Sequence, residues 1–477
     1  MKRKALFLWL FILLSNTSHG QDQEVHILAA NDIHAAVDAF PQLAAIADSL
    51  RALYPSLLVL SAGDNRTGNP VNDIYEISSY PMVALMNQVG FNATALGNHE
   101  FDVNSLPPLM GLSNFSYICA NIYPSENSGL HIVPTQTFDV DGIKVGIIGI
   151  VQVNLQGRPD THPDNVREVR FSTPMNTIRQ YESYSHECNA TILLSHLGYE
   201  DDVKTAEECP WIDLIIGGHS HTQLTAEEPL HNGVLITQNK NKLQNVTHIT
   251  LTFKRGRLRS KQAEYISVKD FPKRNELVEV MVNYFNKNPY FERIVAEASK
   301  PFTEKDELNF LMCDAFLKEG EGDVSVVNNG GIRIDSLAAG NITMREILSM
   351  DPFNNVAVKM EMTGEELLKM LTVYSRGSLY HLPRVGGLIC EVTIDKEDKY
   401  KDRLKHVMLK NADGSPFDLG KTYKVITNSY MSSSCKPFLT CTINSLNVQT
   451  ADMLAHFLRS QGSVRPPSLD RLRIKEE

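Results

Sequence analysis

The sequence has few of the features that would assign it to several large protein classes. Its seven cysteines include no C-x-x-C pair, which excludes zinc ribbons and thioredoxin-like redox motifs. It has 46 Lys and Arg against 56 Asp and Glu, whereas proteins that bind nucleic acid through its phosphates need a basic face. No apolar run approaches the roughly 20 residues that span a bilayer. We therefore expect neither nucleic-acid binding nor a membrane span.

The overall composition is that of a folded protein with more than one core. Of the 477 residues, 42% are hydrophobic and 21% are charged, and the formal charge is −10. At about 100–200 residues per domain, this length predicts two or three domains. Because the chain as a whole is acidic, any binding of phosphate must depend on a local cluster of positive charge.

The first 20 residues have the pattern of a secretory signal peptide. Three basic residues follow Met1, an apolar run covers residues 5–14, and small and polar residues continue to Gly20. No lipobox cysteine follows the run, which favours release over lipid anchoring. Because no hydrophobic tail follows Ile474, we expect a periplasmic or secreted protein rather than one held on an animal cell surface.

The cysteine count is odd, so at least one thiol must be free. Cys435 and Cys441 are close enough in sequence to pair in an oxidising compartment. We nevertheless expect each cysteine to be a buried apolar residue without a disulfide partner.

Residues 24–258 alternate short aliphatic runs with helical patterns. The runs cover residues 25–28, 57–60, 91–96, 190–194 and 212–216, and residues 41–53 form an amphipathic helix with Pro41 in its first turn. Buried strands that alternate with helices predict an α/β layer structure whose ligands bind at the carboxyl ends of the strands.

The pattern changes near residue 267. A polar stretch, residues 275–298, is predicted to be a connecting helix, and an α+β segment follows it. Capping boxes at Thr343/Glu346 and Thr363/Glu366 predict two helix starts, and residues 356–362 alternate as in a strand. We expect a signal peptide at 1–20, a first domain at 21–266, a helical linker at 267–300 and a second domain at 301–477.

Metal-ligand side chains follow five of the aliphatic runs. They are Asp32, His34, Asp64, Asn98, His99, His196, His219 and His221. Carboxylate, imidazole and amide together suit a pair of divalent ions such as Zn²⁺, Mn²⁺ or Fe²⁺. If two aspartates are the only anionic ligands, the site keeps a net positive charge that attracts phosphate.

These motifs carry a resemblance to a known family. Asp32-x-His34, Gly63-Asp64, Gly97-Asn98-His99-Glu100, His196 and Gly218-His219-x-His221 resemble, in order, the motif series of the calcineurin-like metallophosphoesterases. With Asn328–Arg333 and Asp351-Pro352-Phe353, the chain resembles the exported 5′-nucleotidase family along nearly its whole mature length. The resemblance implies a four-layer α/β sandwich of two mixed β-sheets between helices, followed by a smaller α+β substrate-binding domain.

The resemblance also implies a role for each residue of the motifs. Asp64 would bridge two metals, with Asp32, His34 and His221 completing one site and Asn98, His196 and His219 the other. His99 would lie beside the scissile phosphate, oriented by Asp102, where it could stabilise charge or protonate the leaving oxygen. We expect Glu100 to serve its own loop rather than the metals.

In the second domain the resemblance implies contacts to a nucleoside. Asn328 and Arg333 would bind it, and Phe353 and Tyr430 would stack on the two faces of the base. The family continues after the second aromatic residue with a Gly-Gly-Asp-Gly turn, whose aspartate meets the ribose. This chain has Met-Ser-Ser-Ser-Cys-Lys-Pro-Phe at 431–438, with neither glycine nor acid.

The leading hypothesis is an exported two-metal phosphatase that hydrolyses nucleoside 5′-monophosphates. The alternatives are a 2′,3′-cyclic nucleotide phosphodiesterase, a nucleotide-sugar hydrolase and a thiosulfate-ester hydrolase, for which the altered loop leaves room. A non-catalytic nucleotide-binding protein is a further alternative, but it would have no chemical need for His99 and Asp102. The sequence leaves the metal, the base preference and the oligomeric state open.

Overall fold

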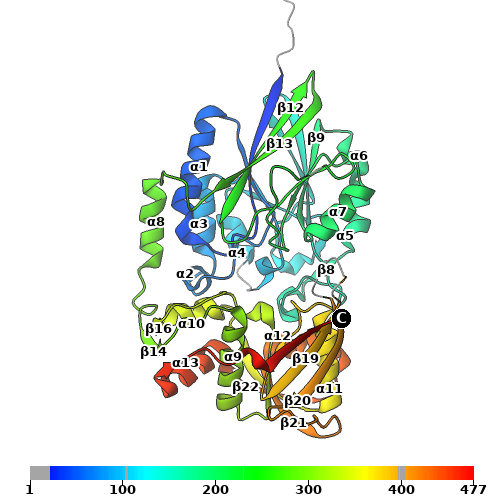
Figure 1. Cartoon of the computed structure of the whole chain (residues 1–477). Helices are drawn as coiled ribbons and strands as arrows, with labels where there is room; N and C mark the ends of the chain where they lie inside the picture. Colours follow the sequence, from blue (N-terminus) through cyan, green and yellow to red (C-terminus); the bar gives the residue numbers. More distant parts are fainter. Residues whose placement is uncertain (1–21, 103–105, 229, 396, 398–402) are drawn as a thin grey trace, which may run out of the picture.

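The computed structural model describes residues 22–102, 106–228, 230–395, 397 and 403–477 (Figure 1). The expected signal peptide at 1–20 lies outside these residues. Among the described residues, no helix is long and apolar enough to cross a membrane. The chain forms two domains, which Figure 1 shows one above the other, with helix α8 (Glu276–Asn286) at their side.

The first domain contains two mixed β-sheets. The six-stranded sheet has the order β13-β12-β1-β2-β3-β4, with β1 (Gln23–Ala30), β2 (Leu58–Ser61), β3 (Ala93–Ala95), β4 (Ser116–Ile118), β12 (Asn245–Lys254) and β13 (Arg257–Ser267). The five-stranded sheet has the order β11-β10-β9-β7-β6, with β6 (Thr135–Val140), β7 (Ile143–Val151), β9 (Ala190–His196), β10 (Leu214–Gly217) and β11 (Leu235–Thr237). In each sheet the strands that carry the site are parallel, and antiparallel strands close an edge.

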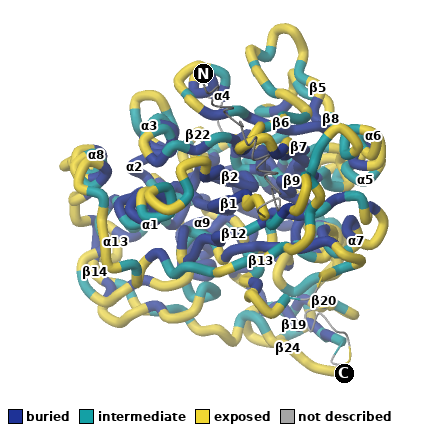
Figure 2. Tube along the Cα trace, turned by 90° about the horizontal axis from the view of Figure 1, so that it is seen from above, coloured by how far each residue is buried: buried dark blue, intermediate teal, exposed yellow. Residues whose placement is uncertain are grey.

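Helices cover the outer faces of both sheets, which confirms the four-layer sandwich. α1 (Phe40–Leu53) and α3 (Tyr80–Val89) pack on the first sheet, while α5 (Pro174–Ile178) and α7 (Tyr199–Glu208) pack on the second. Between the sheets lies an apolar layer that includes Ile27, Ile147 and Ile192, all fully buried. Seen from above, the strands form the buried centre of this domain and the connecting loops its exposed rim (Figure 2).

The predicted connecting helix is only partly correct. Helix α8 ends at Asn286, and Ile294–Ala298 forms strand β14, which pairs with β16 (Gly340–Thr343) and β23 (Ser463–Val464) of the second domain. Pro289 explains the difference, because proline disfavours helical backbone in the residue before it. The β-branched Ile294 and Val295 then favour a strand.

The second domain is a smaller α+β unit. Its main sheet has the order β18-β15-β21-β17-β22, with β15 (Val324–Val327), β17 (Val356–Thr363), β18 (Arg384–Gly386), β21 (Thr422–Asn428) and β22 (Thr442–Gln449). A second sheet contains β19 (Leu388–Ile394), β20 (Leu404–Asn411) and β24 (Leu472–Glu476). The helices are α9 (Lys305–Gly320), α10 (Met344–Met350), α11 (Gly364–Ser375), α12 (Ser429–Cys435) and α13 (Thr450–Gln461). Both predicted capping boxes are present, at the starts of α10 and α11.

Candidate active site

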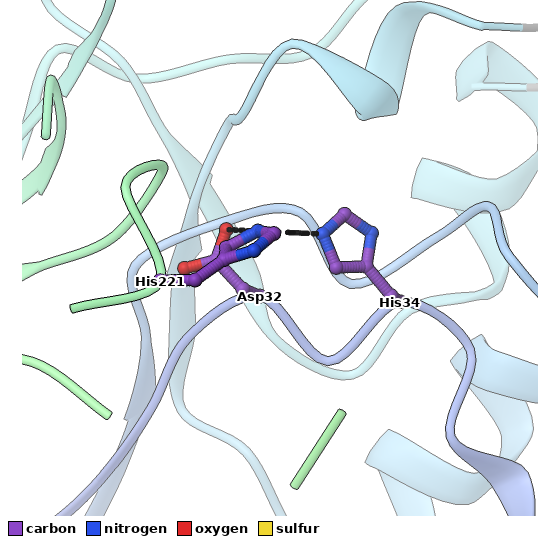
Figure 3. Close-up of side chains that lie close together, drawn as sticks. All are labelled: Asp32, His34 and His221. Carbon is purple, nitrogen blue, oxygen red and sulfur yellow. Dashed lines mark hydrogen bonds and ion pairs between the residues drawn. The ribbon is translucent and has the colours of Figure 1, made fainter. Parts of the chain in front are cut away.

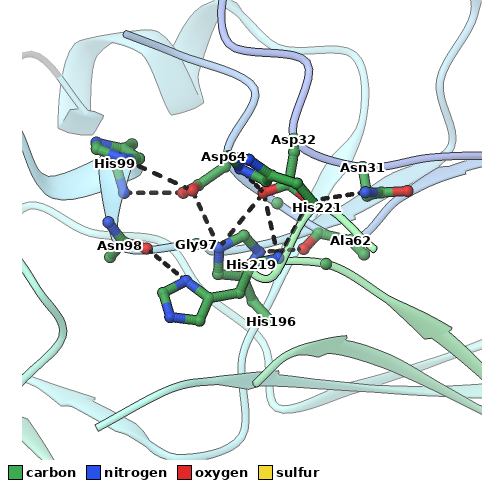
Figure 4. Close-up of polar contacts among 12 residues, drawn as sticks. Asn31, Asp32, Ala62, Asp64, Gly97, Asn98, His99, His196, His219 and His221 are labelled. Carbon is green, nitrogen blue, oxygen red and sulfur yellow. Dashed lines mark hydrogen bonds and ion pairs between the residues drawn. The ribbon is translucent and has the colours of Figure 1, made fainter. Parts of the chain in front are cut away.

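The side chains that follow the five aliphatic runs meet at one edge of the two sheets (Figure 4). Asp32 and His34 follow β1, Asp64 follows β2, Asn98 and His99 follow β3, His196 ends β9, and His219 and His221 follow β10. Parallel strands present their carboxyl ends at the same edge, which explains why motifs far apart in the sequence converge here.

One group comprises Asp32, His34 and His221 (Figure 3). The Nε2 atom of His221 lies 3.3 Å from Oδ1 of Asp32 and 3.2 Å from Nε2 of His34. Asn31 donates a 2.7 Å hydrogen bond to Oδ2 of Asp32 and thereby holds that carboxylate in place. This group is the set of side chains predicted for one metal site.

A second group comprises Asp64, His196 and His219, with Asn98 beside it. Oδ2 of Asp64 lies 3.1 Å from Nε2 of His196, and Nδ1 of His219 lies 3.1 Å from Oδ1 of Asn98. Oδ2 of Asp64 is also 3.9 Å from Nε2 of His34. Asp64 therefore lies between the two groups, where a bridging ligand would have to be.

The centre of the cluster favours positive charge. Burial opposes the ionisation of Asp64, yet His196 and His99 hold the pKa of this carboxyl well below its usual range. Burial also disfavours the charged form of His196, but Asp64 and Asp32 raise its pKa to about 10. A cation close to Asp64 is therefore strongly stabilised.

Two of the histidines, His34 and His219, present unprotonated ring nitrogens to this centre. Burial lowers the pKa of His219 to about 4 and that of His34 well below its usual range, so both rings are neutral. Nδ1 of His34 lies 3.2 Å from the Thr67 carbonyl, and Nδ1 of His196 lies 2.8 Å from the Ala62 carbonyl. Each carbonyl can accept a proton from Nδ1, and Nε2 of both rings lies toward Asp64, at 3.9 Å for His34 and 3.1 Å for His196. Nε2 of His196 is buried, and the Asp64 carboxylate is its neighbour at 3.1 Å.

The backbone at the cluster is strained. Five of the predicted ligands have left-handed φ angles: Asp32, His34, Asp64, His219 and His221. Such residues cost about 1–3 kcal/mol each and gather at functional sites. At Gly97 a Cβ atom would lie 2.1 Å from Oδ1 of Asp64, so only glycine admits this carboxylate. The donor set, its electrostatics and this close packing all fit a pair of divalent cations.

The loop after β3 carries two further groups. Nδ1 of His99 lies 2.6 Å from Oδ2 of Asp102, as the sequence predicts for an oriented imidazole. The carboxylate of Glu100, which is 1% exposed, accepts hydrogen bonds from the backbone N–H groups of Asp64, Asn65 and Gly97. Glu100 thus serves its own loop, as expected, and also ties it to the loop that follows β2, which was not expected.

The second domain faces this cluster across a cleft of about 1500 Å³. Asn328, Arg333, Phe353 and Tyr430 all line it. A guanidinium nitrogen of Arg333 lies 3.2 Å from both ring nitrogens of His34, and the Phe353 ring stacks 5.7 Å from the His99 ring. The structure therefore brings the predicted substrate contacts to the predicted metal residues.

The segment after Tyr430 is a helix instead of the family's turn. Asn428 caps α12 by accepting a 2.8 Å hydrogen bond from the N–H of Met431, and Met431 and Cys435 bury one side of the helix. All seven cysteines, each within the described residues, are free, so Cys435 and Cys441 do not pair.

Sequence reasoning missed several residues of the cleft. Asp160 of the first domain and Arg376 of the second form an ion pair at 2.7 Å, and Tyr374 lies beside them. Asn241, which lies 3.1 Å from Nδ1 of His221, was also missed. None of these residues belongs to a strand-end motif, so no local signal could have identified them.

Comparisons with known proteins agree with this arrangement. The family model for calcineurin-like phosphoesterases matches residues 25–223, and the model for the 5′-nucleotidase C-terminal domain matches residues 289–441. A 5′-nucleotidase from Vibrio vulnificus is 27% identical over 67% of this chain and 68% of its own length.

Two solved structures share the fold. The 5′-nucleotidase precursor from Thermus thermophilus has a TM-score of 0.82 and 23% identity, covering 95% of this chain and all of that one. The sulfate thiohydrolase SoxB from the same organism has a TM-score of 0.73 and 18% identity, covering 91% of this chain and 82% of that one.

Proposed function

Because the chain belongs to the 5′-nucleotidase family and is a hydrolase of the metallophosphoesterase type, we propose that it hydrolyses nucleoside 5′-monophosphates to nucleoside and phosphate. The observation that carries the proposal is the position of Asp64. It belongs to one group of candidate ligands, lies 3.9 Å from His34 of the other group, and lines the same cleft as Arg333 and Phe353.

We assign two divalent cations to the cluster, with Zn²⁺, Mn²⁺ and Fe²⁺ as the candidates. Asp64 would ligate both, with Asp32, His34 and His221 completing one site and Asn98, His196 and His219 the other. When bound, two such metal ions activate water and bind phosphoryl oxygens. The neutral rings of His34 and His219 support this assignment, because only an unprotonated imidazole nitrogen can ligate a metal.

We propose that His99 donates a proton to the leaving group. Its Nε2 faces the cluster, 4.0 Å from Oδ2 of Asp64, while Asp102 holds its Nδ1. Burial works against charge on His99, but Asp102 and Asp64 raise its pKa, which favours the imidazolium. As the phosphorus–oxygen bond to the nucleoside breaks, the Nε2 proton would pass to the departing oxygen.

The second domain would bind the rest of the nucleotide. Arg333 lies close enough to the cluster to contact phosphoryl oxygens, and Asn328 is placed to contact the nucleoside. Phe353 and Tyr430 would hold the base by stacking, which tolerates any base because each has a π-face. The contact between the Phe353 and His99 rings supports a nucleotide that reaches from the proposed base site to the proposed metal site.

The test is hydrolysis of a substrate panel with Zn²⁺ or Mn²⁺ added, with the products identified by chromatography, because a cyclic nucleotide or a nucleotide sugar is cleaved without release of free phosphate. The panel contains nucleoside monophosphates, 2′,3′-cyclic nucleotides, nucleotide sugars and p-nitrophenyl phosphate, and Asp64→Asn is the control for contaminating phosphatase. We expect the highest kcat/KM for nucleoside 5′-monophosphates. A higher value for cyclic nucleotides or nucleotide sugars would replace the proposed substrate with that class.

One observation favours a second candidate, a thiosulfate-ester hydrolase. Among the described residues that line the cleft, the second domain contributes no carboxylate that could meet a ribose. Hydrolysis of a thiosulfate ester, with no phosphate release from any nucleotide, would decide for this reaction.

We also propose that the protein is exported to the periplasm or secreted. The support is the basic, apolar and small-residue pattern of residues 1–20. Expression with these residues intact should yield an extracytoplasmic protein whose measured mass lacks them. A cytoplasmic protein of full mass would contradict the proposal.

A further inference from the structure

The segment Asp160–Asn165 of the first domain, which we call the strap, lies against the loop that carries Asn98 and Asp102. The Asp160 carbonyl accepts a 3.2 Å hydrogen bond from Nδ2 of Asn98. This bond fixes the rotation of the Asn98 amide and leaves its Oδ1 facing Nδ1 of His219 at 3.1 Å. The strap therefore determines which atom Asn98 presents to the proposed metal site.

The strap also holds the other end of that loop. Oγ1 of Thr161, a residue only 2% exposed, donates to the Phe101 carbonyl at 3.2 Å and to Oδ1 of Asp102 at 3.4 Å. Nδ2 of Asn165 donates to the Asp102 carbonyl at 2.8 Å. Since Asp102 in turn holds His99, the proposed proton donor also depends on where the strap lies.

The second domain binds the strap from across the cleft. Arg376, which caps the end of α11, donates from NH2 to Oδ1 of Asp160 at 2.7 Å and from NH1 to Oδ2 at 3.1 Å. Asn154 donates a 2.8 Å hydrogen bond to the same carboxylate. Ser433 of α12 lies 3.1 Å from Nε2 of His162 in the strap. A two-pronged arginine–carboxylate pair fixes orientation as well as distance.

We propose that the Arg376–Asp160 pair is a latch that couples the docking of the second domain against the strap to the geometry of Asn98 and Asp102. Arg376 is then a positioning residue that acts through the strap. With the latch formed, the strap holds Asn98 and Asp102 in their working orientations. With the latch broken, both are held less tightly, and metal affinity and turnover fall together.

Arg376 also lines the cleft, so a direct contact with substrate must be distinguished from a latch. The two roles differ in what they predict in the absence of substrate. A latch changes metal binding to the free protein, whereas a substrate contact changes only the KM of substrates that reach Arg376.

The experiment compares Arg376→Gln, Arg376→Lys and a matched control, Arg471→Gln. Arg471 forms the same two-pronged pair, at 2.6 and 3.1 Å, with Asp314 inside the second domain and does not touch the strap. Metal affinity is measured by titrating the metal-depleted full-length protein with Zn²⁺ or Mn²⁺, and kcat is measured with p-nitrophenyl phosphate.

We expect Arg376→Gln to weaken one of the two metal-binding steps by about 10-fold, the lower range for losing a supporting group. The kcat for p-nitrophenyl phosphate should fall by a similar factor, Arg376→Lys should retain part of both, and Arg471→Gln should change neither. Wild-type metal affinity and kcat in Arg376→Gln, with a raised KM for nucleotides alone, would overturn the latch. Equal losses in Arg471→Gln would also overturn it.

The latch rests on the proposed function only for its activity measurement. If the wild-type protein releases phosphate from p-nitrophenyl phosphate but from no nucleotide, the proposed substrate is wrong. The metal affinities of the same variants then still decide the latch.

Discussion

The two walls of the cleft differ in charge and in the origin of their residues. Carboxylates on the first-domain wall are Asp64, Asp102, Asp160, Asp164, Glu200 and Asp201. The described lining residues of the second domain include no carboxylate and instead offer Arg333, Arg376, His381 and Arg403. An acidic wall suits the binding of metal cations, and a basic wall suits the binding of a phosphate dianion. The comparison separates the residues that we assign to the chemistry from those that we assign to recognition.

The walls also differ in how tightly their residues are held. Asp32 and His196 are fully buried, and five of the seven predicted ligands have strained backbones. Phe353 and Tyr430 are only half-buried, and the segment that follows Tyr430 is helical. We therefore expect the first wall to tolerate less change than the second.

The largest effect is expected for Asp64→Asn, which tests whether the first wall binds the metals. Because Asp64 lies between both ligand groups, we expect loss of bound metal and a fall in kcat greater than the roughly 10- to 100-fold typical of a supporting group. Metal content and phosphate release measure the two effects. Retention of both metals would show that Asp64 is not a shared ligand.

Next in size is His99→Ala. Removing a proton donor that is not a metal ligand should lower kcat by about 100- to 10,000-fold. Metal content should stay at the wild-type value, as measured by elemental analysis. If this variant loses its metals while Asp64→Asn keeps them, the assigned roles are inverted.

On the second wall we expect smaller effects, confined to recognition. Removal of one ring of a base sandwich costs about 1–3 kcal/mol, so Phe353→Ala or Tyr430→Ala should raise KM for nucleoside monophosphates by roughly 5- to 150-fold. Steady-state kinetics with p-nitrophenyl phosphate, which cannot use both rings, should change little. Equal losses on both substrates would show that these rings serve the fold.

The smallest effect concerns Asp351, which precedes the Phe353 loop. Burial raises its pKa to about 6, and Thr450 donates a hydrogen bond to it. The folded state therefore binds the proton more tightly than the unfolded state. The contribution of Asp351 to the free energy of unfolding is therefore fully present below about pH 4 and is lost as the pH rises through 6. The loss between pH 4.5 and pH 7 is about 2 kcal/mol.

Asp351→Asn should remove that part of the pH dependence. Urea unfolding of both proteins at pH 4.5 and pH 7 measures it, because the contributions of other groups cancel in the comparison. If the free energy of unfolding changes between pH 4.5 and pH 7 by the same amount in the variant as in the wild type, Asp351 does not titrate in this range.

Much of the fold was predictable because its signals are local. The helix predicted over 41–53 is α1, and both capping boxes start the helices they predict. The strand β14 was not predicted, because its stability comes from pairing with β16 and β23, which lie far along the chain. Polar composition within residues 275–298 gave no sign of those partners.

The sequence by itself determined the group of candidate metal ligands on the first domain, because each of them belongs to a short motif at the end of a buried strand, and parallel strands bring their ends together. Only the tertiary structure decided the relation between the walls. Asp160 and Arg376 are 216 residues apart and belong to no repeating pattern, so their pairing follows from how the two domains pack. The same packing places Arg333 against His34 and Phe353 against His99. These contacts could not be predicted from the sequence, because contacts between domains leave no periodicity in either segment.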